Sequence, residues 1–106
     1  MTTVTTVPES DFDTLLKSEN LLVVDFTATW CGPCRLVAPL MEQLSQEYKE
    51  SIKVVKIDVD QDKPLAKKYE VRTIPAVLYF KNGELVETIK GVSPYEEFSN
   101  AVKAHI

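Results

Sequence analysis

The stretch LLVVDFT at residues 21–27, followed two residues later by WCGPC at residues 30–34, decides the fold of this chain. The first seven residues are almost continuously apolar, which is typical of a strand buried on both faces at the centre of an α/β sheet. The second motif holds both cysteines of the chain, Cys31 and Cys34. A helical pattern begins directly after it. The sequence therefore predicts a cysteine pair at a strand-to-helix turn.

Apolar spacing and turn residues predict the other elements. In chain order we expect a strand over residues 2–7, a helix opened by residues 8–11, the strand 21–27, a long helix after Cys34, a strand over 52–59, a helix over 61–69, strands over 76–81 and 84–90, and a helix opened by residues 93–94. Asn82-Gly83 favours a tight hairpin between the last two strands, because both residues tolerate positive φ. This order predicts an α/β fold with a mixed sheet of five strands flanked by about four helices.

The long helix after Cys34 shows apolar residues at spacings of three and four, which indicates one inward face. The residues expected on that face are Leu36, Val37, Leu40, Met41 and Leu44.

Length and composition set further bounds. The 106 residues have an average apolar content of 44%, which fits a single domain over residues 1–106. The net charge of −4 argues against a nucleic-acid partner, because phosphates would be repelled. No apolar run approaches the length of about 20 residues that a membrane span needs. The first residues carry neither a basic region nor an apolar stretch, so we expect no secretory signal.

The spacing of Cys31 and Cys34 suits redox chemistry. Cys31 lies at the start of a helix, where unpaired N–H groups and the helix dipole stabilise a thiolate. Cys34 lies one turn further and can reach back to the Cys31 sulfur. Gly32 allows a partner chain to approach closely, and Pro33 fits an early helix position whose N–H needs no acceptor. We expect Cys31 to be the exposed, low-pKa thiol and Cys34 the buried one.

Other interpretations of the cysteine pair are weaker. A structural disulfide over so short a loop would restrict the unfolded chain little. A zinc site needs about four ligands, and the chain offers no further cysteine and only His105.

A calcium loop is suggested by Asp58, Asp60 and Asp62, but Lys63 stands where the glycine of such a loop belongs. We therefore expect no metal and read these acids as a strand end and a helix cap.

Asp25 is an unusual residue for a buried strand. A charged carboxylate is costly to bury, so its pKa should be raised. One interpretation is a strand-end acid that reaches water. The other is a buried proton acceptor for Cys34, with Lys56 on the neighbouring strand sharing its charge. Lys56 is equally well explained as a solvated lysine.

The WCGPC motif at residues 30–34 resembles the active site of the thioredoxin family. The flanking matches lie in the same order along essentially the whole chain, namely Val24-Asp25-Phe26, Arg35, Pro39, Lys56-Ile57-Asp58, Ile74-Pro75, Phe80-Lys81-Asn82-Gly83 and Gly91. The resemblance implies a thioredoxin fold and a thiol-disulfide oxidoreductase that reduces disulfides in other proteins. It also implies recycling by a thioredoxin reductase of unknown type and a role in electron transport and cell redox homeostasis.

The resemblance also implies a docking surface for substrate. It makes the Ile74–Pro75 bond cis, although most X–Pro bonds are trans. The expected surface comprises Trp30, Gly32, Pro33, Ile74, Pro75, Gly91 and Val92. Core packing is the alternative for Trp30, since a lone tryptophan is more often buried. Thr27 and Ala76 depart from the residues that the family often carries there, Trp and Thr.

The leading hypothesis is a protein-disulfide reductase that works through Cys31 and Cys34. Its electrons reside in its own sulfurs, so we expect no bound cofactor. We expect a monomer in the cytoplasm, or in an organelle if a transit peptide was removed. The alternatives are a thiol oxidase or isomerase, which the Gly-Pro dipeptide disfavours, and a binding subunit that clamps a partner without turnover.

Overall fold

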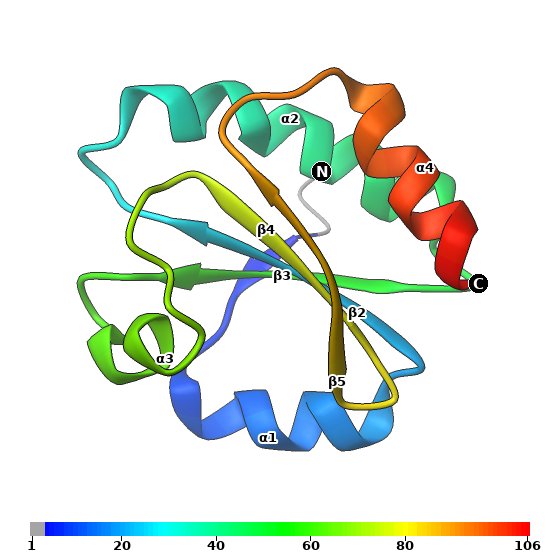
Figure 1. Cartoon of the computed structure of the whole chain (residues 1–106), viewed down its shortest axis with the longest axis horizontal. Coiled ribbons are helices and arrows are strands. Elements are labelled where there is room, and N and C mark those ends of the chain that lie inside the picture. The colour runs from blue at the N-terminus through cyan, green and yellow to red at the C-terminus, as the bar shows by residue number, and fades with distance from the viewer. Residues whose placement is uncertain (1–3) are drawn as a thin grey trace.

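The computed structural model describes residues 4–106. Its elements in chain order are β1 (Thr5–Thr6), α1 (Glu9–Ser18), β2 (Leu21–Thr27), α2 (Gly32–Glu47), β3 (Lys53–Asp58), α3 (Lys63–Lys68), β4 (Ala76–Lys81), β5 (Glu84–Lys90) and α4 (Tyr95–His105). The described strands form one sheet in the order β1-β3-β2-β4-β5 (Figure 1). The predicted α/β fold and its element order are confirmed.

The sheet is mixed, as the sequence predicts. β2 occupies its centre, parallel to β3 and antiparallel to β4. β1 is parallel to β3, and β5 is antiparallel to β4. A central strand is buried on both faces, which explains the unbroken apolar run from Leu21 to Val24.

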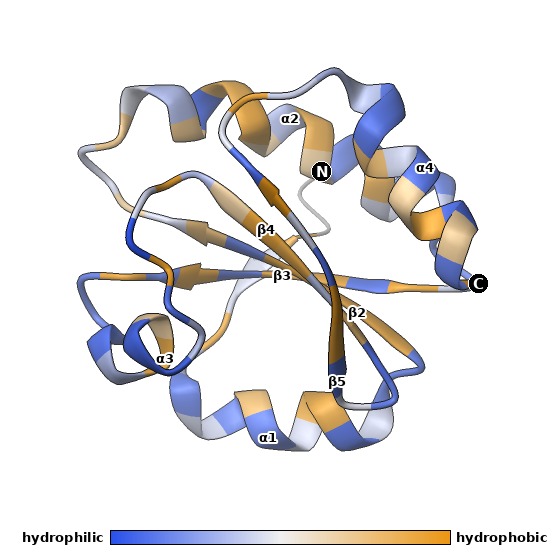
Figure 2. Cartoon of the chain, viewed as in Figure 1, coloured by the Kyte–Doolittle hydropathy of each residue, from blue (hydrophilic) through white to orange (hydrophobic). Residues whose placement is uncertain are grey.

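Helices cover both faces of the sheet. α2 and α4 lie on one face, and α1 and α3 lie on the other (Figure 1). Each helix turns its apolar side toward the strands (Figure 2). Because side chains alternate along a strand, β2 contributes Leu21 and Val23 to the α2 and α4 side and Leu22, Val24 and Phe26 to the α1 and α3 side. The odd-numbered residues of β2 therefore face α2 and α4, and the even-numbered residues face α1 and α3.

Two clusters of buried side chains fill the space between helices and sheet. On the α2 and α4 side, the helices supply Val37, Met41, Leu44, Phe98 and Val102. On the other side, Phe12 of α1 makes edge-on ring contacts with Tyr69 and Phe80, at centroid separations of 5.8 and 5.5 Å. Such aromatic contacts add to the stabilisation from burial alone.

The structure corrects several predicted boundaries. β1 is only Thr5–Thr6, and residues 2–3 of the predicted strand lie outside the described residues. β3 and α3 are each shorter than predicted, at Lys53–Asp58 and Lys63–Lys68. Hydrogen bonds continue just beyond both elements, since the Val59 N–H donates to the Thr27 carbonyl after β3 and the Tyr69 N–H donates to the Leu65 carbonyl after α3. Leu36 is 62% exposed rather than inward-facing, because Val37, Met41 and Leu44 form the buried stripe of α2.

The β4–β5 hairpin has the predicted boundaries and turn. Asn82 and Gly83 both adopt positive φ, at 51° and 86°, as a tight two-residue hairpin requires. One irregularity was not predicted: Tyr79 pairs with Glu87, but Phe80 pairs with Leu85. Val86 is therefore the extra residue of a β-bulge in β5.

No helix among residues 4–106 is both long enough and apolar enough to cross a membrane.

The hydroxyl of Tyr79 ties the centre of the sheet to α4. It is fully buried and donates a 3.0 Å hydrogen bond to the Phe98 carbonyl. Burial raises the pKa of Tyr79, so the hydroxyl keeps its proton. Tyr79→Phe leaves that carbonyl without this donor and should lower the free energy of unfolding by about 1–2 kcal/mol in urea denaturation. Tyr95→Phe is the control: its hydroxyl bonds Glu47 at the exposed surface, and we expect a loss below about 0.5 kcal/mol. Equal losses would contradict the role given to Tyr79.

Candidate active site

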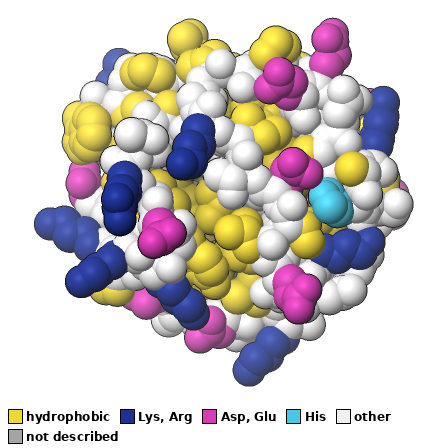
Figure 3. Space-filling view, viewed as in Figure 1, with side chains coloured by type: hydrophobic (Ala, Val, Ile, Leu, Met, Phe, Trp, Pro, Cys, Tyr) yellow, Lys and Arg dark blue, Asp and Glu magenta, His cyan; other side chains and the backbone are white. Residues whose placement is uncertain are grey.

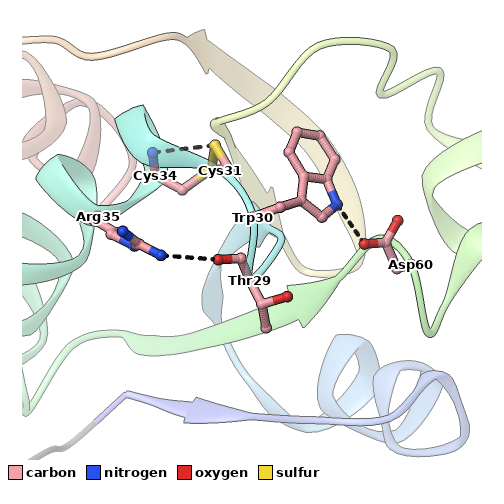
Figure 4. The surroundings of a disulfide bond; sticks show 6 residues. All are labelled: Thr29, Trp30, Cys31, Cys34, Arg35 and Asp60. Carbon is pink, nitrogen blue, oxygen red and sulfur yellow. Dashed lines mark hydrogen bonds between the residues drawn. A yellow bond between two sulfur atoms is a disulfide. The ribbon is translucent and has the colours of Figure 1, made fainter.

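Cys31 and Cys34 form a disulfide at the N-terminus of α2 (Figure 4). Their Cα atoms are 5.3 Å apart. Cys31 is the N-cap of the helix, and its sulfur accepts a 3.2 Å hydrogen bond from the Cys34 backbone N–H. Proline occupies the first turn, where its missing N–H costs nothing. The same N–H group and helix end would stabilise a thiolate on Cys31 once the disulfide is reduced.

The two cysteines do not differ in burial in this disulfide form. Cys31 and Cys34 are each 3% exposed, so the expectation that Cys31 is the exposed one is not met here. Ala28, Val59 and Ile74 pack against the pair. These residues come from segments that follow β2, follow β3 and precede β4, and all three segments meet at the same end of the sheet. Sequence spacing alone does not show this convergence.

Asp25 lies behind the disulfide, on the α2 side of β2. Alternate residues of a strand point to the same side, so Asp25 faces the side that Leu21 and Val23 face. The residue is 1% exposed, and its Oδ1 has no hydrogen-bond partner among the described residues. Burial raises the pKa of Asp25 to about 7, although the nearby Lys56 charge acts in the opposite direction. The prediction of a buried acid with a raised pKa is confirmed.

Lys56 is the register partner of Asp25 in the parallel β2–β3 pair. It is half-buried, which fits neither a fully solvated lysine nor a buried one. A cleft of about 310 Å³ contains Asp25, Lys56, Thr27 and Cys34 in its walls. The structure thus brings together the carboxyl group, the ammonium group and the inner cysteine that the sequence singled out.

The predicted docking residues surround the disulfide. Trp30 is 67% exposed, so the core-packing alternative is wrong. Val92 is 50% exposed, and Gly32 and Pro33 are exposed as well. The Ile74–Pro75 bond is cis, as the family resemblance implied.

A second loop joins this apolar surface. Gly91 adopts positive φ, at 78°, and its N–H donates a 2.8 Å hydrogen bond to the Pro75 carbonyl. This bond holds the loop that carries Gly91 and Val92 against the Ile74–Pro75 segment. Ile74 is half-buried against the cysteines, and Pro75 is buried. The seven predicted residues thus belong to segments that contact one another or the disulfide.

One partner in this region was missed by the sequence analysis. The Trp30 indole N–H donates a 2.6 Å hydrogen bond to Asp60 Oδ2 (Figure 4). The Arg35 guanidinium donates to the Thr29 carbonyl at 3.3 Å, which ties the helix start to the preceding loop. β2 and β3 are parallel neighbours, so the residues that follow them meet at the same end of the sheet. That topology was the available signal for Asp60.

The remaining acids near Asp60 serve local structure. Asp58 ends β3, and its Oδ1 accepts hydrogen bonds from the N–H groups of Asp60 and Gln61. Asp62 precedes α3, and its Oδ1 accepts from the Glu9 N–H instead of capping its own helix. Within residues 4–106, no three His, Cys, Asp or Glu side chains are grouped closely enough to hold a metal ion.

Similarity to known proteins extends over nearly the whole chain. The thioredoxin family model matches residues 3–104. A thioredoxin from Staphylococcus epidermidis is 41% identical over 100 residues, covering 94% of this chain and 95% of that protein. A thioredoxin from Bacillus subtilis is 46% identical over 89 residues, covering 84% of this chain and 86% of that protein.

Solved structures give the same result. A thioredoxin from Malassezia sympodialis superposes with a TM-score of 0.89 at 29% identity, covering 99% of this chain and 92% of that one. A mutant thioredoxin from Halobacterium salinarum superposes with a TM-score of 0.88 at 29% identity, covering 96% and 88%.

A mixed sheet that carries a disulfide of Cys-x-x-Cys spacing at a helix N-terminus defines a thiol-disulfide oxidoreductase. Together with the match over residues 3–104, it shows that this chain belongs to the thioredoxin family. Its activity is protein-disulfide reduction through the Cys31–Cys34 pair.

The raised pKa of Asp25 makes stability depend on pH. The folded pKa of about 7 lies above the unfolded value near 3.8, so the native state binds this proton more tightly. Asp25 therefore opposes folding increasingly as pH rises from about 4 to about 7, and the full penalty remains above that range. Asp25→Asn removes this penalty. In the oxidised protein we expect a gain of about 2–4 kcal/mol at pH 8 and little change at pH 4.

Urea denaturation at the two pH values measures this difference. Asp13→Asn on the exposed side of α1 is the matched control and should show no comparable pH dependence. An equal effect of Asp25→Asn at pH 4 and pH 8 would contradict a strained, buried acid.

Proposed function

We propose that Cys31 attacks the target disulfide and that Cys34 resolves the resulting intermediate with help from Asp25. The position of Cys31 as N-cap of α2 supports its assignment as the attacking group, since a thiolate there faces the helix N-terminus. Cys34 lies inside the helix and lines the cleft that also contains Asp25. The two sulfurs therefore have different surroundings although both are buried.

The reaction transfers two electrons to the target. The Cys31 thiolate attacks one sulfur of the target disulfide, forming a mixed disulfide and releasing the other target sulfur as a thiolate, which takes up a proton. The Cys34 thiolate then attacks the Cys31 sulfur and releases the second target thiolate, which also takes up a proton. The target disulfide becomes two thiols, and the Cys31–Cys34 disulfide remains.

Asp25 is the proposed acceptor of the Cys34 proton. A thiol in an apolar setting resists ionisation, and a carboxyl group with a pKa of about 7 exchanges protons readily near neutral pH. Lys56 opposes the rise of that pKa, so we assign it the role of keeping Asp25 available as a base. Asp25 and Lys56 line the same cleft as Cys34, which supports a proton path from Cys34 to Asp25.

The wider setting follows from the same chemistry. We propose that a thioredoxin reductase restores the dithiol and that the targets are proteins with accessible disulfides. A chain from a yeast structure, described as the basis of thiol resolution in a mitochondrial 1-Cys peroxiredoxin via glutathione/thioredoxin systems, is 33% identical with a TM-score of 0.84. Its description supports targets and recycling of this kind. The dithiol carries the electrons, so no bound cofactor is needed.

The molecule is proposed to act as a single-domain monomer over residues 1–106. The two cysteines both belong to the redox pair, which suits a reducing compartment such as the cytoplasm or an organelle.

Single-cysteine variants test this division of roles. Cys34→Ser should accumulate one equivalent of target in a mixed disulfide on Cys31 and show no turnover of insulin disulfides. Cys31→Ser should neither trap target nor turn over. Intact mass and peptide mapping locate the trapped cysteine. Trapping of target on Cys34 in the Cys31→Ser variant, with no trapping by Cys34→Ser, would reverse the assignment.

Asp25→Asn separates the two chemical steps. It keeps the shape of the side chain and removes the proton acceptor, so decay of the mixed disulfide should slow by about 10- to 100-fold near pH 7. The first attack by Cys31 should change by less than about threefold. Acid-quenched single-turnover kinetics resolve both steps, and Asp13→Asn serves as the control. Resolution at the wild-type rate would remove Asp25 from the mechanism.

A further inference from the structure

The bulge in β5 changes which side chains the β4–β5 hairpin presents on its α1 and α3 side. Three cross-strand pairs share that side: Ala76 with Lys90, Leu78 with Thr88, and Phe80 with Leu85. Regular alternation from Lys90 and Thr88 would place Val86 next on this side. The extra residue of the bulge places Leu85 there instead, while Val86 packs against the cluster on the opposite side.

A groove of about 280 Å³ lies on this side of the hairpin. Its floor is formed by Ala76 and Leu78, and Tyr69 and Val71 of the segment after α3 form one wall. Leu85 is 44% exposed at the opposite side. Figure 3 shows hydrophobic side chains gathered between α3 and β5, above α1 in this view. Five of its ten lining residues are apolar or aromatic, namely Tyr69, Val71, Ala76, Leu78 and Leu85.

Basic groups border this groove although the chain as a whole carries a net charge of −4. Arg72 and Lys90 line it, and the ammonium of Lys68 lies 5.5 Å from the centroid of the Tyr69 ring. Glu70 is the one acid among the residues that line it. Lys and Arg side chains lie on the α3 side of the hydrophobic patch in Figure 3. The border thus favours carboxylates.

The groove lies close along the chain to the surroundings of the disulfide, since Thr73 and Ala76 line it on either side of Ile74-Pro75. Ile74 packs against the cluster of Ala28, Cys31 and Cys34, and Ala76, two residues further along the chain, lies in the groove floor. Two residues of extended chain span about 7 Å. A polypeptide whose cysteine reaches Cys31 therefore brings residues two to four positions away over Ala76 and Leu78 in the groove floor.

We propose that this groove binds a bulky apolar side chain with an adjacent carboxylate, both lying two to four residues from the reactive cysteine of an extended target segment. Leu85, Tyr69 and Val71 would cover the apolar group, and Arg72 and Lys90 would face the carboxylate. The proposal rests on the disulfide reductase function. It makes the hairpin a determinant of which target disulfides are reduced fastest.

Synthetic peptides provide the probe. Each ten-residue peptide carries one cysteine and is supplied as its disulfide-linked homodimer. One peptide of each pair has Leu-Asp-Glu starting two residues from the cysteine, and its partner has Ser-Asn-Gln. In the first pair the triplet precedes the cysteine, and in the second pair it follows the cysteine. We expect the reduced wild-type protein to react about tenfold faster with the Leu-Asp-Glu peptide in one of the two pairs.

Variants assign that preference to the groove. Leu85→Ser and Arg72→Gln should each lower the preference to about threefold or less, while reduction of the Ser-Asn-Gln peptide stays unchanged. The Arg72→Gln effect should shrink at 0.5 M salt, because exposed charges are screened. Ile106→Ser and Lys103→Gln are the matched controls, since both positions are exposed at the end of α4. Both should keep the tenfold preference.

The outcomes separate this proposal from the reductase function. Equal reduction of both peptides in each pair by wild type, or an undiminished preference in Leu85→Ser and Arg72→Gln, overturns the groove alone. Failure to reduce any peptide overturns the function on which it rests. Light scattering at the assay concentration gives a further check: a wild-type dimer that Leu85→Ser converts to a monomer makes the groove a contact between copies, and overturns target binding.

Discussion

Burying a carboxylate on a central strand is costly, and Asp25 is 1% exposed with one oxygen unpartnered. The sheet tolerates it because the group holds its proton up to about pH 7. The alternation of β2 that buries its leucines and valines also directs Asp25 toward α2, and the parallel register places Lys56 beside it. The surrounding fold therefore fixes both the cost of this acid and its position near Cys34. Replacing it should stabilise the molecule and slow the reaction, which is the exchange expected of a residue retained for chemistry.

The start of α2 stabilises the thiolate of Cys31. A thiolate needs positive potential, and the first turn of α2 supplies an N–H from Cys34 together with the helix dipole. Asp25 and the helix end thus have opposite electrostatic effects on the pair. The helix end favours the anion on Cys31, whereas in the proposed mechanism the ionisation state of Asp25 governs when Cys34 can ionise. The two cysteines can differ in reactivity although their exposure is the same in the disulfide.

Local sequence patterns predicted the elements whose bounds depend only on residues near them in the chain. The bounds of β2, β4 and β5 and the turn at Asn82-Gly83 follow from apolar runs and turn residues, and the structure has them as predicted. Other features depend on neighbours that are distant in sequence. The Trp30 to Asp60 hydrogen bond needs β2 and β3 side by side, and the exposure of Leu36 depends on which stripe of α2 meets the sheet. The bulge at Val86 depends on pairing with β4 and leaves no mark in the apolar pattern of β5.

The cleft that contains Asp25 and the groove proposed to select targets occupy opposite sides of the sheet. The cleft with Asp25, Lys56 and Cys34 lies on the α2 side, whereas the groove beside Leu85 lies on the α1 and α3 side. The segment around Ile74 and Pro75 links the disulfide to the strand that forms the groove floor: Ile74 packs against the cluster of Ala28, Cys31 and Cys34, and β4 begins at Ala76. Substitutions in the groove can therefore alter which targets bind without changing the proton acceptor or the helix end.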